Sequence, residues 1–317
     1  YCYTLSIDVA RVAVLGCGRW GQNHLKTLHN LRNEGIVDTI HAIDVSKRAR
    51  DGSTHADYVS EKIDHQEIDL VIIATPSKLH AAQAKELMEK GYHVLVEKPL
   101  GCCEAEAAQV LVSAQENGRM VSVGLLLRFH PAVQTAKRMI SNGKIGRIES
   151  LRFVRRTERP APNDGNVIES LGVHAIDLMC HLMNESEPSA VNVQGDRIDS
   201  RIILEYPMGI EALIDVAWDS SEERRLVKII GSTGTLIFDL NIHDRLTLIT
   251  SDEKKEFQCD SYHTPLEGEL RHALDGVRAV KRGKPWSPVP DYGAALRGVR
   301  WTERAILAMP VSRQIQE

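Results

Sequence analysis

The stretch that decides the fold reads GCGRWG and runs from Gly16 to Gly21. A short apolar run, Arg11 to Leu15, stands directly before it, and an amphipathic stretch, Gln22 to Arg32, follows it. A strand, a glycine-rich turn and a helix in this order are typical of a dinucleotide-binding domain, because the glycines let a pyrophosphate group approach the free N–H groups at the helix N-terminus. Without this context, the same six residues would indicate only an ordinary tight turn.

An acidic residue marks the end of the next expected strand. Asp44 follows the strand pattern from Thr39 to Ile43. Its carboxylate can accept hydrogen bonds from both hydroxyls of a ribose and would repel a 2′-phosphate, which favours NAD over NADP. Lys47 and Arg48 come soon afterwards, so NADP stays an alternative. Around the glycine turn we expect cofactor contacts from Gly16, Gly18, Arg19, Trp20, Gly21 and Asp44.

Strand and helix patterns alternate through the first part of the chain. Further apolar strand patterns run from Leu70 to Ala74, from His93 to Val96 and from Met120 to Gly124. This alternation predicts a doubly wound parallel sheet with right-handed crossovers, which is a Rossmann fold. Beyond these patterns the strands are joined by short turns, which predicts an α+β domain with a large, mostly antiparallel open sheet. We therefore expect an α/β protein with a dinucleotide-binding domain over residues 1–126 and a second domain over residues 127–317.

Two short motifs fall at the carboxyl ends of expected parallel strands, where open α/β sheets bind their ligands. They are Thr75-Pro76 and Glu97-Lys98-Pro99. A lysine at this edge can donate a hydrogen bond to a substrate hydroxyl and stabilise the negative charge that develops there. The alternative is a surface lysine that pairs with Glu97. We expect further cofactor contacts from Thr75, Pro76, His80, Glu97 and Lys98.

A third motif, GVHAID, runs from Gly172 to Asp177. On a helix His174 and Asp177 stand three residues apart and share a face. A histidine with a nearby carboxylate can act as a general base, although a histidine in such a helix can also be structural. Cys180 and His181 follow closely and raise the question of a zinc site. Because Cys180 points partly away from the common face, we predict no metal.

Arginines gather near the start of the second domain, at positions 152, 155, 156 and 159. They can bind a diphosphate through paired hydrogen bonds, or they can keep the edge of a sheet charged and solvated. Arg128 stands earlier, just after the last strand of the first domain, and we expect its side chain to point towards the substrate.

These segments together resemble the glucose–fructose oxidoreductase / inositol dehydrogenase / MocA family of NAD(P)-dependent oxidoreductases. The similar segments read VAVLGCGRWGQNHLKTL, DLVIIATPSKLHAAQAKELMEKGYHVLVEKPL, VGLLLRFHP, GVHAIDLM and PVPDYGAALRGVRWTERAI. The resemblance implies that the second domain binds substrate and forms oligomers through its sheet, and that substrates are sugars, polyols or sugar nucleotides. It also implies that His174 is the catalytic histidine. Many members carry an acid four residues before this histidine, where this chain has Ser170 beside Glu169.

The prediction is an NAD(P)-dependent dehydrogenase that transfers a hydride between the cofactor and a secondary hydroxyl. Lys98, His174 and Asp177 are the expected catalytic residues, and Lys98, Arg128, Ser170 and His174 are the expected substrate contacts. Two alternatives follow from Ser170 and from the family: a catalytically silent dinucleotide-binding regulator, and a glycoside hydrolase that uses NAD.

Composition limits the other possibilities. A net charge of −4 argues against nucleic-acid binding, which needs a basic face. No apolar run approaches the ~20 residues that cross a bilayer. The six cysteines include no C-x-x-C pair. We expect a cytoplasmic homo-oligomer, a dimer or tetramer, that acts on a small carbohydrate and binds neither nucleic acid nor membrane.

Overall fold

The computed structural model describes residues 9–63 and 67–310, and the chain divides into two compact units. The first unit comprises residues up to Leu125 together with Leu266–Leu296. The second comprises Leu126–Pro265 and the residues from Arg297 onward. The expected division near residue 126 placed everything beyond it in one domain. In the structure the segment Leu266–Leu296 instead packs with the first unit, because its helix completes that unit's core.

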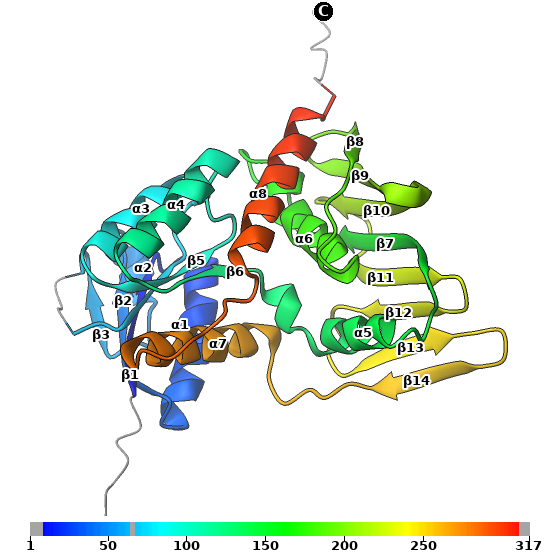
Figure 1. Cartoon of the computed structure of the whole chain (residues 1–317). Coiled ribbons are helices and arrows are strands. Elements are labelled where there is room, and N and C mark those ends of the chain that lie inside the picture. The colour runs from blue at the N-terminus through cyan, green and yellow to red at the C-terminus, as the bar shows by residue number, and fades with distance from the viewer. Residues whose placement is uncertain (1–8, 64–66, 311–317) are drawn as a thin grey trace, which may run out of the picture. The chain divides into compact units, whose positions relative to one another are not determined.

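The first unit contains a six-stranded parallel sheet in the order β3-β2-β1-β4-β5-β6 (Figure 1). This order is that of the Rossmann fold and confirms the prediction. The strands are β1 (Ala10–Leu15), β2 (Val37–Ile43), β3 (Tyr58–Ser60), β4 (Leu70–Ile73), β5 (His93–Glu97) and β6 (Val121–Gly124). The helices that connect or cover them are α1 (Arg19–Asn33), α2 (Lys47–Asp51), α3 (Ser77–Glu89), α4 (Glu104–Glu116) and α7 (Pro265–Lys281).

The central strands are buried on both faces, as their continuous apolar sequences predict. β4 reads LVII and each of its residues is buried. α1 covers the sheet with Leu25, Leu28 and Leu31, which stand at helical spacing and share one core with the apolar face of α7. The helices therefore cover the faces of the sheet and leave the carboxyl ends of its strands to the loops.

The second unit is built on an eight-stranded sheet in the order β14-β13-β12-β11-β7-β10-β9-β8. Its strands are β7 (Ile148–Arg156), β8 (Ala190–Gly195), β9 (Asp199–Tyr206), β10 (Ile210–Ala217), β11 (Arg224–Gly231), β12 (Thr235–Asp239), β13 (Arg245–Ile249) and β14 (Lys254–Gln258). Only the pair β7 and β10 is parallel among these ladders, so the predicted mostly antiparallel sheet is confirmed.

Helices pack on one face of this sheet. They are the short helix η1 (Leu126–Phe129), α5 (Pro131–Ser141), the π-helical turn η2 (Ile168–Gly172) and α6 (Val173–Leu182). A short turn, η3 (Pro207–Gly209), joins β9 to β10, and α8 (Tyr292–Leu307) runs from residues of the first unit into residues of the second. Along β7 the residues that face the helices, such as Leu151 and Phe153, are buried, whereas Arg152 on the opposite face is exposed. This alternation leaves the second face of the sheet open.

Candidate functional site

Backbone geometry explains why two of the glycines in the turn after β1 have to be glycines. Gly16 has a φ of +95°, and a Cβ atom there would lie 2.7 Å from the backbone of Ala74 and Thr75. A Cβ on Gly21 would lie 1.9 Å from the carbonyl oxygen of Gly16, so α1 packs directly against the turn. At Gly18, the N-cap of α1, an added Cβ would meet no described atom within 4 Å. The open space at Gly18 therefore leaves room for a ligand beside the N-terminus of α1.

Asp44 stands beside this turn and is held in place by backbone groups. Its carboxylate accepts hydrogen bonds from the N–H groups of Cys17, at 2.7 Å, and Ser46, at 2.8 Å. The guanidinium group of Arg50 donates to the carbonyl oxygen of Asp44 at 2.6 Å. Each carboxylate oxygen still has lone pairs for another donor, and the residue is partly exposed. The geometry thus suits recognition of ribose hydroxyls.

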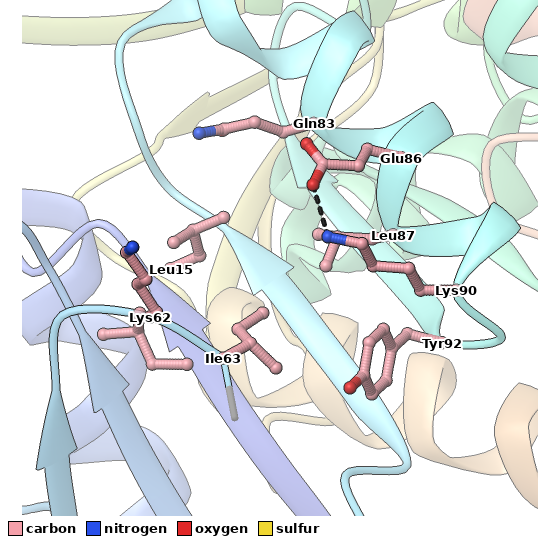
Figure 2. A pocket seen from close by; sticks show the side chains of 9 residues that line it. Leu15, Lys62, Ile63, Gln83, Glu86, Leu87, Lys90 and Tyr92 are labelled. Carbon is pink, nitrogen blue, oxygen red and sulfur yellow. Dashed lines mark hydrogen bonds and ion pairs between the residues drawn. The ribbon is translucent and has the colours of Figure 1, made fainter. Parts of the chain in front are cut away.

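A cavity of about 270 Å³ adjoins the same edge of the sheet. Its lining consists of Leu15, Ile43, Lys62, Ile63, Gln83, Glu86, Leu87, Lys90 and Tyr92. Figure 2 shows Lys62 and Ile63 across the cavity from Gln83 and Glu86 of α3. On the same helix, Glu86 forms an ion pair with Lys90. The sequence did not predict this cavity, because no sequence motif indicates that the residues after β3 line a ligand-sized space.

The turns that follow β4 and β5 are tied together by one buried histidine. The ring nitrogens of His80 lie 2.8 Å from the carbonyl oxygens of Pro99 and Thr75. Thr75 also donates from its hydroxyl to Gln83, at 2.6 Å, and Pro76 is the N-cap residue of α3. His80 is therefore placed to position the two predicted cofactor turns, and its direct contact with cofactor stays a prediction.

Glu97 is the last residue of β5 and its side chain is buried. Its Oε1 atom lies 2.8 Å from Nε2 of His24 on α1, and its Oε2 atom accepts from the N–H of Lys98 at 3.3 Å. A Cβ on Gly124 would lie 3.1 Å from that Oε2 atom, so the carboxylate rests against the end of β6. This packing fixes the backbone immediately before Lys98.

In the second unit, His174 occupies the first turn of α6 and is buried. The π-helical turn η2 precedes it and contains Glu169 and Ser170, both partly exposed. π-Helical turns are rare and occur often at functional sites, because the extra residue per turn changes the direction of side chains. The structure thus sets Ser170 on an irregular turn just before His174.

Asp177 and Arg128 form a buried ion pair. The guanidinium group of Arg128 donates to both oxygens of Asp177, at 2.7 and 2.9 Å, and also to Glu185 at 2.9 Å. Both side chains of the pair are almost completely buried. Burial alone would lower the pKa of Arg128, but the charges of Asp177 and Glu185 raise it above its ordinary value. The structure turns the side chain of Arg128 inward onto α6, and its contact with substrate stays a prediction.

Further residues complete this network, and sequence reasoning missed them. The carboxylate of Glu185 forms ion pairs with the guanidinium groups of Arg128 and Arg297. It also lies 2.7 Å from the Nδ1 atom of His181. Burial raises the pKa of Glu185, but the hydrogen bonds from His181 and Arg128 outweigh it and lower that pKa strongly. Glu185 has a φ of 64° just after α6, and no motif marks it. Arg297 lies within the similar C-terminal segment PVPDYGAALRGVRWTERAI, but no role was predicted for it.

The arginine cluster on β7 is paired within the sheet. Arg152 and Arg201 both contact the buried carboxylate of Asp215, at 3.1 and 2.8 Å, and Arg156 pairs with Asp199 at 2.6 Å. These contacts favour the charged, solvated sheet face over a diphosphate site.

A metal site and a membrane-spanning helix are two further features that a chain of this size can contain. In the described part of the chain, no group of three or more histidine, cysteine and acidic side chains could hold a metal ion. Over the same residues, no helix is both long enough and apolar enough to cross a membrane.

Comparisons with known proteins place the chain. Residues 10–125 match the model of an oxidoreductase family with an NAD-binding Rossmann fold, and residues 133–237 match the model of the GFO/IDH/MocA C-terminal domain. The two matches cover well over half of the chain. The chain belongs to the GFO/IDH/MocA oxidoreductase family.

Relatives of this GFO/IDH/MocA protein include two inositol dehydrogenases. It is 28% identical over 267 residues to inositol 2-dehydrogenase 2 of Saccharopolyspora erythraea, covering 77% of this chain and 76% of the relative. It is 25% identical to scyllo-inositol 2-dehydrogenase (NAD⁺) of Bacillus subtilis, covering 86% and 87%. These relatives and the family confirm the prediction of an NAD(P)-dependent oxidoreductase of the dehydrogenase class.

Solved structures share the fold. KijD10, a 3-ketoreductase from Actinomadura kijaniata in complex with TDP-benzene and NADP, superposes with a TM-score of 0.82 at 18% identity, covering 95% of this chain and 98% of the other. A levoglucosan dehydrogenase in complex with NADH and levoglucosan gives a TM-score of 0.77 at 18% identity, covering 94% and 96%. One fold thus accommodates NADP and NADH.

Proposed function

We propose that this protein transfers a hydride between NAD(P) and a secondary hydroxyl group of a sugar, polyol or nucleotide sugar. The observation that carries the proposal is the meeting, at one edge of a parallel sheet, of the glycine turn, Asp44 and the Glu97-Lys98-Pro99 turn. The relatives add support, since they are named inositol dehydrogenases and a levoglucosan dehydrogenase.

The cofactor end of the proposal rests on Asp44 and the open space beside Gly18. The free N–H groups at the start of α1 would hold the pyrophosphate, and the carboxylate of Asp44 would accept from the ribose hydroxyls. We place the adenosine part of the cofactor beside the cavity of Figure 2, because Leu15 and Ile43 line it and directly precede Gly16 and Asp44. The charge of Asp44 makes NAD the preferred form.

Alcohol oxidation removes a proton from oxygen and a hydride from carbon. Bound nicotinamide supplies the hydride acceptor. In our proposal His174 takes the hydroxyl proton, and Lys98 donates a hydrogen bond to the alkoxide as its charge develops. Ser170, on the turn before His174, is a proposed substrate contact.

We assign Asp177 and Arg128 to positioning rather than to chemistry. Their carboxylate and guanidinium groups face each other inside the second unit and join η1 to α6. A fixed α6 holds the ring of His174 in one orientation, which a general base needs.

Substrate oxidation gives the direct test. The protein, NAD⁺ or NADP⁺ and a panel of inositols, hexoses, anhydrosugars and nucleotide sugars should yield reduced cofactor, measured by its absorbance, with at least one substrate. His174→Asn should lower kcat about 10²–10⁴-fold and leave the Kd for NADH nearly unchanged, because general acid–base catalysis contributes about that much.

Other outcomes separate the alternatives. NADH binding with no turnover on any substrate, together with a co-purifying partner protein, would favour a regulator. This candidate stays open because Ser170 occupies the position of the usual acid. Glycoside cleavage without accumulation of reduced cofactor would favour an NAD-using hydrolase.

We also propose that the open face of the eight-stranded sheet forms the contact in a homo-oligomer. Apolar side chains such as Leu213 and Ile237 lie on that face between the charged ones and are only partly buried. Light scattering of the purified protein would measure the mass in solution, and a monomer at micromolar concentration would contradict this assembly. Residence in the cytoplasm stays a prediction.

A further inference from the structure

A short helix, α2, carries an arginine whose side chain returns to the loop after β2. The guanidinium group of Arg50 donates to the carbonyl oxygens of Asp44, at 2.6 Å, and Val45, at 3.1 Å. The same group donates to the carboxylate of Glu61, just after β3, at 2.8 Å. Only 15% of the Arg50 side chain is exposed, so these contacts are largely shielded from solvent. Arg50 therefore joins the loop that contains Asp44 to the residue that follows β3.

The helix that carries this arginine is itself held in place. The side-chain amide of Gln22, on α1, donates to the carbonyl oxygen of Cys17 at 3.0 Å and to the hydroxyl of Ser53 at 3.1 Å. Ser53 is buried, and its hydroxyl donates to the carbonyl oxygen of Ala49 at 2.9 Å. These bonds connect α2 to α1 and to the glycine turn. The backbone of Arg50 is thus anchored beside that turn.

The backbone of Asp44 is bonded on both sides. Its N–H group donates to the carbonyl oxygen of Ser60 at 3.2 Å, and its carbonyl oxygen accepts from Arg50. The carboxylate accepts from the N–H groups of Cys17 and Ser46. A carboxylate that recognises ribose hydroxyls has to keep its direction, because hydrogen bonds weaken steeply when their angle is poor. Holding the backbone of Asp44 holds that direction.

We propose that Arg50 is a positioning residue that sets the selection of NAD over NADP, by holding Asp44 where its carboxylate meets the ribose. The inference rests on the proposed function for the identity of the ligand. With Asp44 held, two ribose hydroxyls donate to its carboxylate, whereas a 2′-phosphate is repelled by it. With Asp44 released, the hydroxyls lose their acceptor and the phosphate is no longer repelled. The selection of NAD then weakens for both reasons.

The charge of Arg50 by itself would have the opposite effect. A positive group in this loop attracts a phosphate, so its removal without any movement of Asp44 would weaken the binding of NADPH more than that of NADH. The sign of the change in selection therefore separates a positioning role from a simple effect of charge.

The test is a fluorescence titration of the full chain with NADH and with NADPH. The selection ratio is the Kd for NADPH divided by the Kd for NADH. In Arg50→Met this ratio should fall about tenfold, which is the contribution of roughly one hydrogen bond to a charged group. Arg50→Lys keeps a donor for the carbonyl oxygen of Asp44 and should restore part of the ratio. An unchanged ratio in Arg50→Met, or a ratio that rises, would overturn the proposal.

A double-mutant cycle shows whether Arg50 acts through Asp44. In the Asp44→Asn background, Arg50→Met should change the selection ratio by less than about twofold, because the carboxylate that Arg50 positions is no longer charged. An equally large fall in both backgrounds would mean that Arg50 acts independently of Asp44, which contradicts the proposal.

A second variant replaces Arg50→Met if that protein does not fold. Ser53→Ala removes the bond from Gln22 and loosens the anchor of α2 without a change of charge. It should lower the selection ratio by about fivefold, which is the usual contribution of one neutral hydrogen bond. An unchanged ratio in this variant would then overturn the proposal.

Arg278→Met is the matched control. The guanidinium group of Arg278, on α7, also donates to a backbone carbonyl beside β2, that of Ile36 at 3.3 Å, and to the exposed carboxylate of Asp275 at 3.1 Å. Ile36 precedes β2, whereas Asp44 follows it. The control should therefore keep the wild-type selection ratio. An equal fall in the control would show a general loss of structure and contradict a specific role for Arg50.

Failure of this inference and failure of the proposed function give different results. If both cofactors bind but no alcohol is oxidised, the proposed hydride transfer fails, and the selection ratio still tests Arg50. If an alcohol is oxidised and Arg50→Met keeps the wild-type ratio, the inference fails while the proposed function stands. If neither cofactor binds, both are contradicted.

Discussion

Lys98 follows a buried carboxylate and a strand end, and its backbone N–H is bonded to Glu97. Its side chain is the proposed donor to the developing alkoxide. Lys98→Met should therefore lower kcat/KM about 10²–10³-fold, which is the usual contribution of one such donor, with little change in the Kd for NADH. Steady-state kinetics and a fluorescence titration measure the two quantities.

The matched control is Lys85→Met on α3, where the ammonium group donates to Gln109 at 3.1 Å. It should keep wild-type kinetics. Full turnover by Lys98→Met would remove Lys98 from the mechanism.

Asp44 carries the proposed preference for NAD. Asp44→Asn keeps an acceptor oxygen but removes the charge that repels a 2′-phosphate. The ratio of kcat/KM with NADP⁺ to that with NAD⁺ should rise at least about tenfold, because like charges in contact cost several kcal/mol. Asp51→Asn, at the exposed end of α2, is the control. An unchanged ratio would mean that other groups select the cofactor.

At the level of elements, the buried ion pair between η1 and α6 contributes to the stability of the second unit. Removing one member of a buried pair leaves the other charge unpaired and costs about 3–5 kcal/mol. Asp177→Leu and Arg128→Met should each lower the free energy of unfolding by an amount of this order. The double variant should lose much less than the sum of the two.

Urea unfolding of the four proteins in this cycle measures the coupling between the two residues. Strictly additive losses would show that Arg128 is held by Glu185 and not by Asp177.

The elements also show how far sequence reasoning reaches. The glycine turn, Asp44 and the carboxyl-edge turns were predictable, because each lies within a strand-turn-helix pattern that is local in sequence. The partners of Arg128 were not predicted. Asp177 and Glu185 stand about fifty residues away in the sequence, and no local pattern pairs them with Arg128.

For the whole molecule, acid should destabilise both units through buried histidines. Burial lowers the pKa of His93 in the first unit and of His130 in the second, each to about 4. Because the folded state disfavours the charged ring, this stability is complete above the unfolded pKa of about 6.5 and is lost as pH falls towards 4.

Single variants isolate this contribution from that of other groups. Between pH 6.5 and 4 the free energy of unfolding of His93→Asn should depend on pH less steeply than wild type, by about 1.4 kcal/mol per pH unit. Denaturation at several pH values measures the slopes, and parallel curves would mean that His93 is protonated in the folded protein.

The segment Leu266–Leu296 packs with the first unit, although it lies close to the end of the chain and is followed only by the residues from Arg297 onward. This arrangement has a consequence for synthesis. As the chain leaves the ribosome, the strands and helices up to Leu125 emerge first, but Leu270, Leu274 and Val277 of their core are still untranslated. Domains ordinarily fold in the order of translation, at about 5–20 residues per second. The core of the nucleotide-binding half is therefore completed only after α7 has been made, and that of the second unit, which includes Trp301 and Ala305, later still.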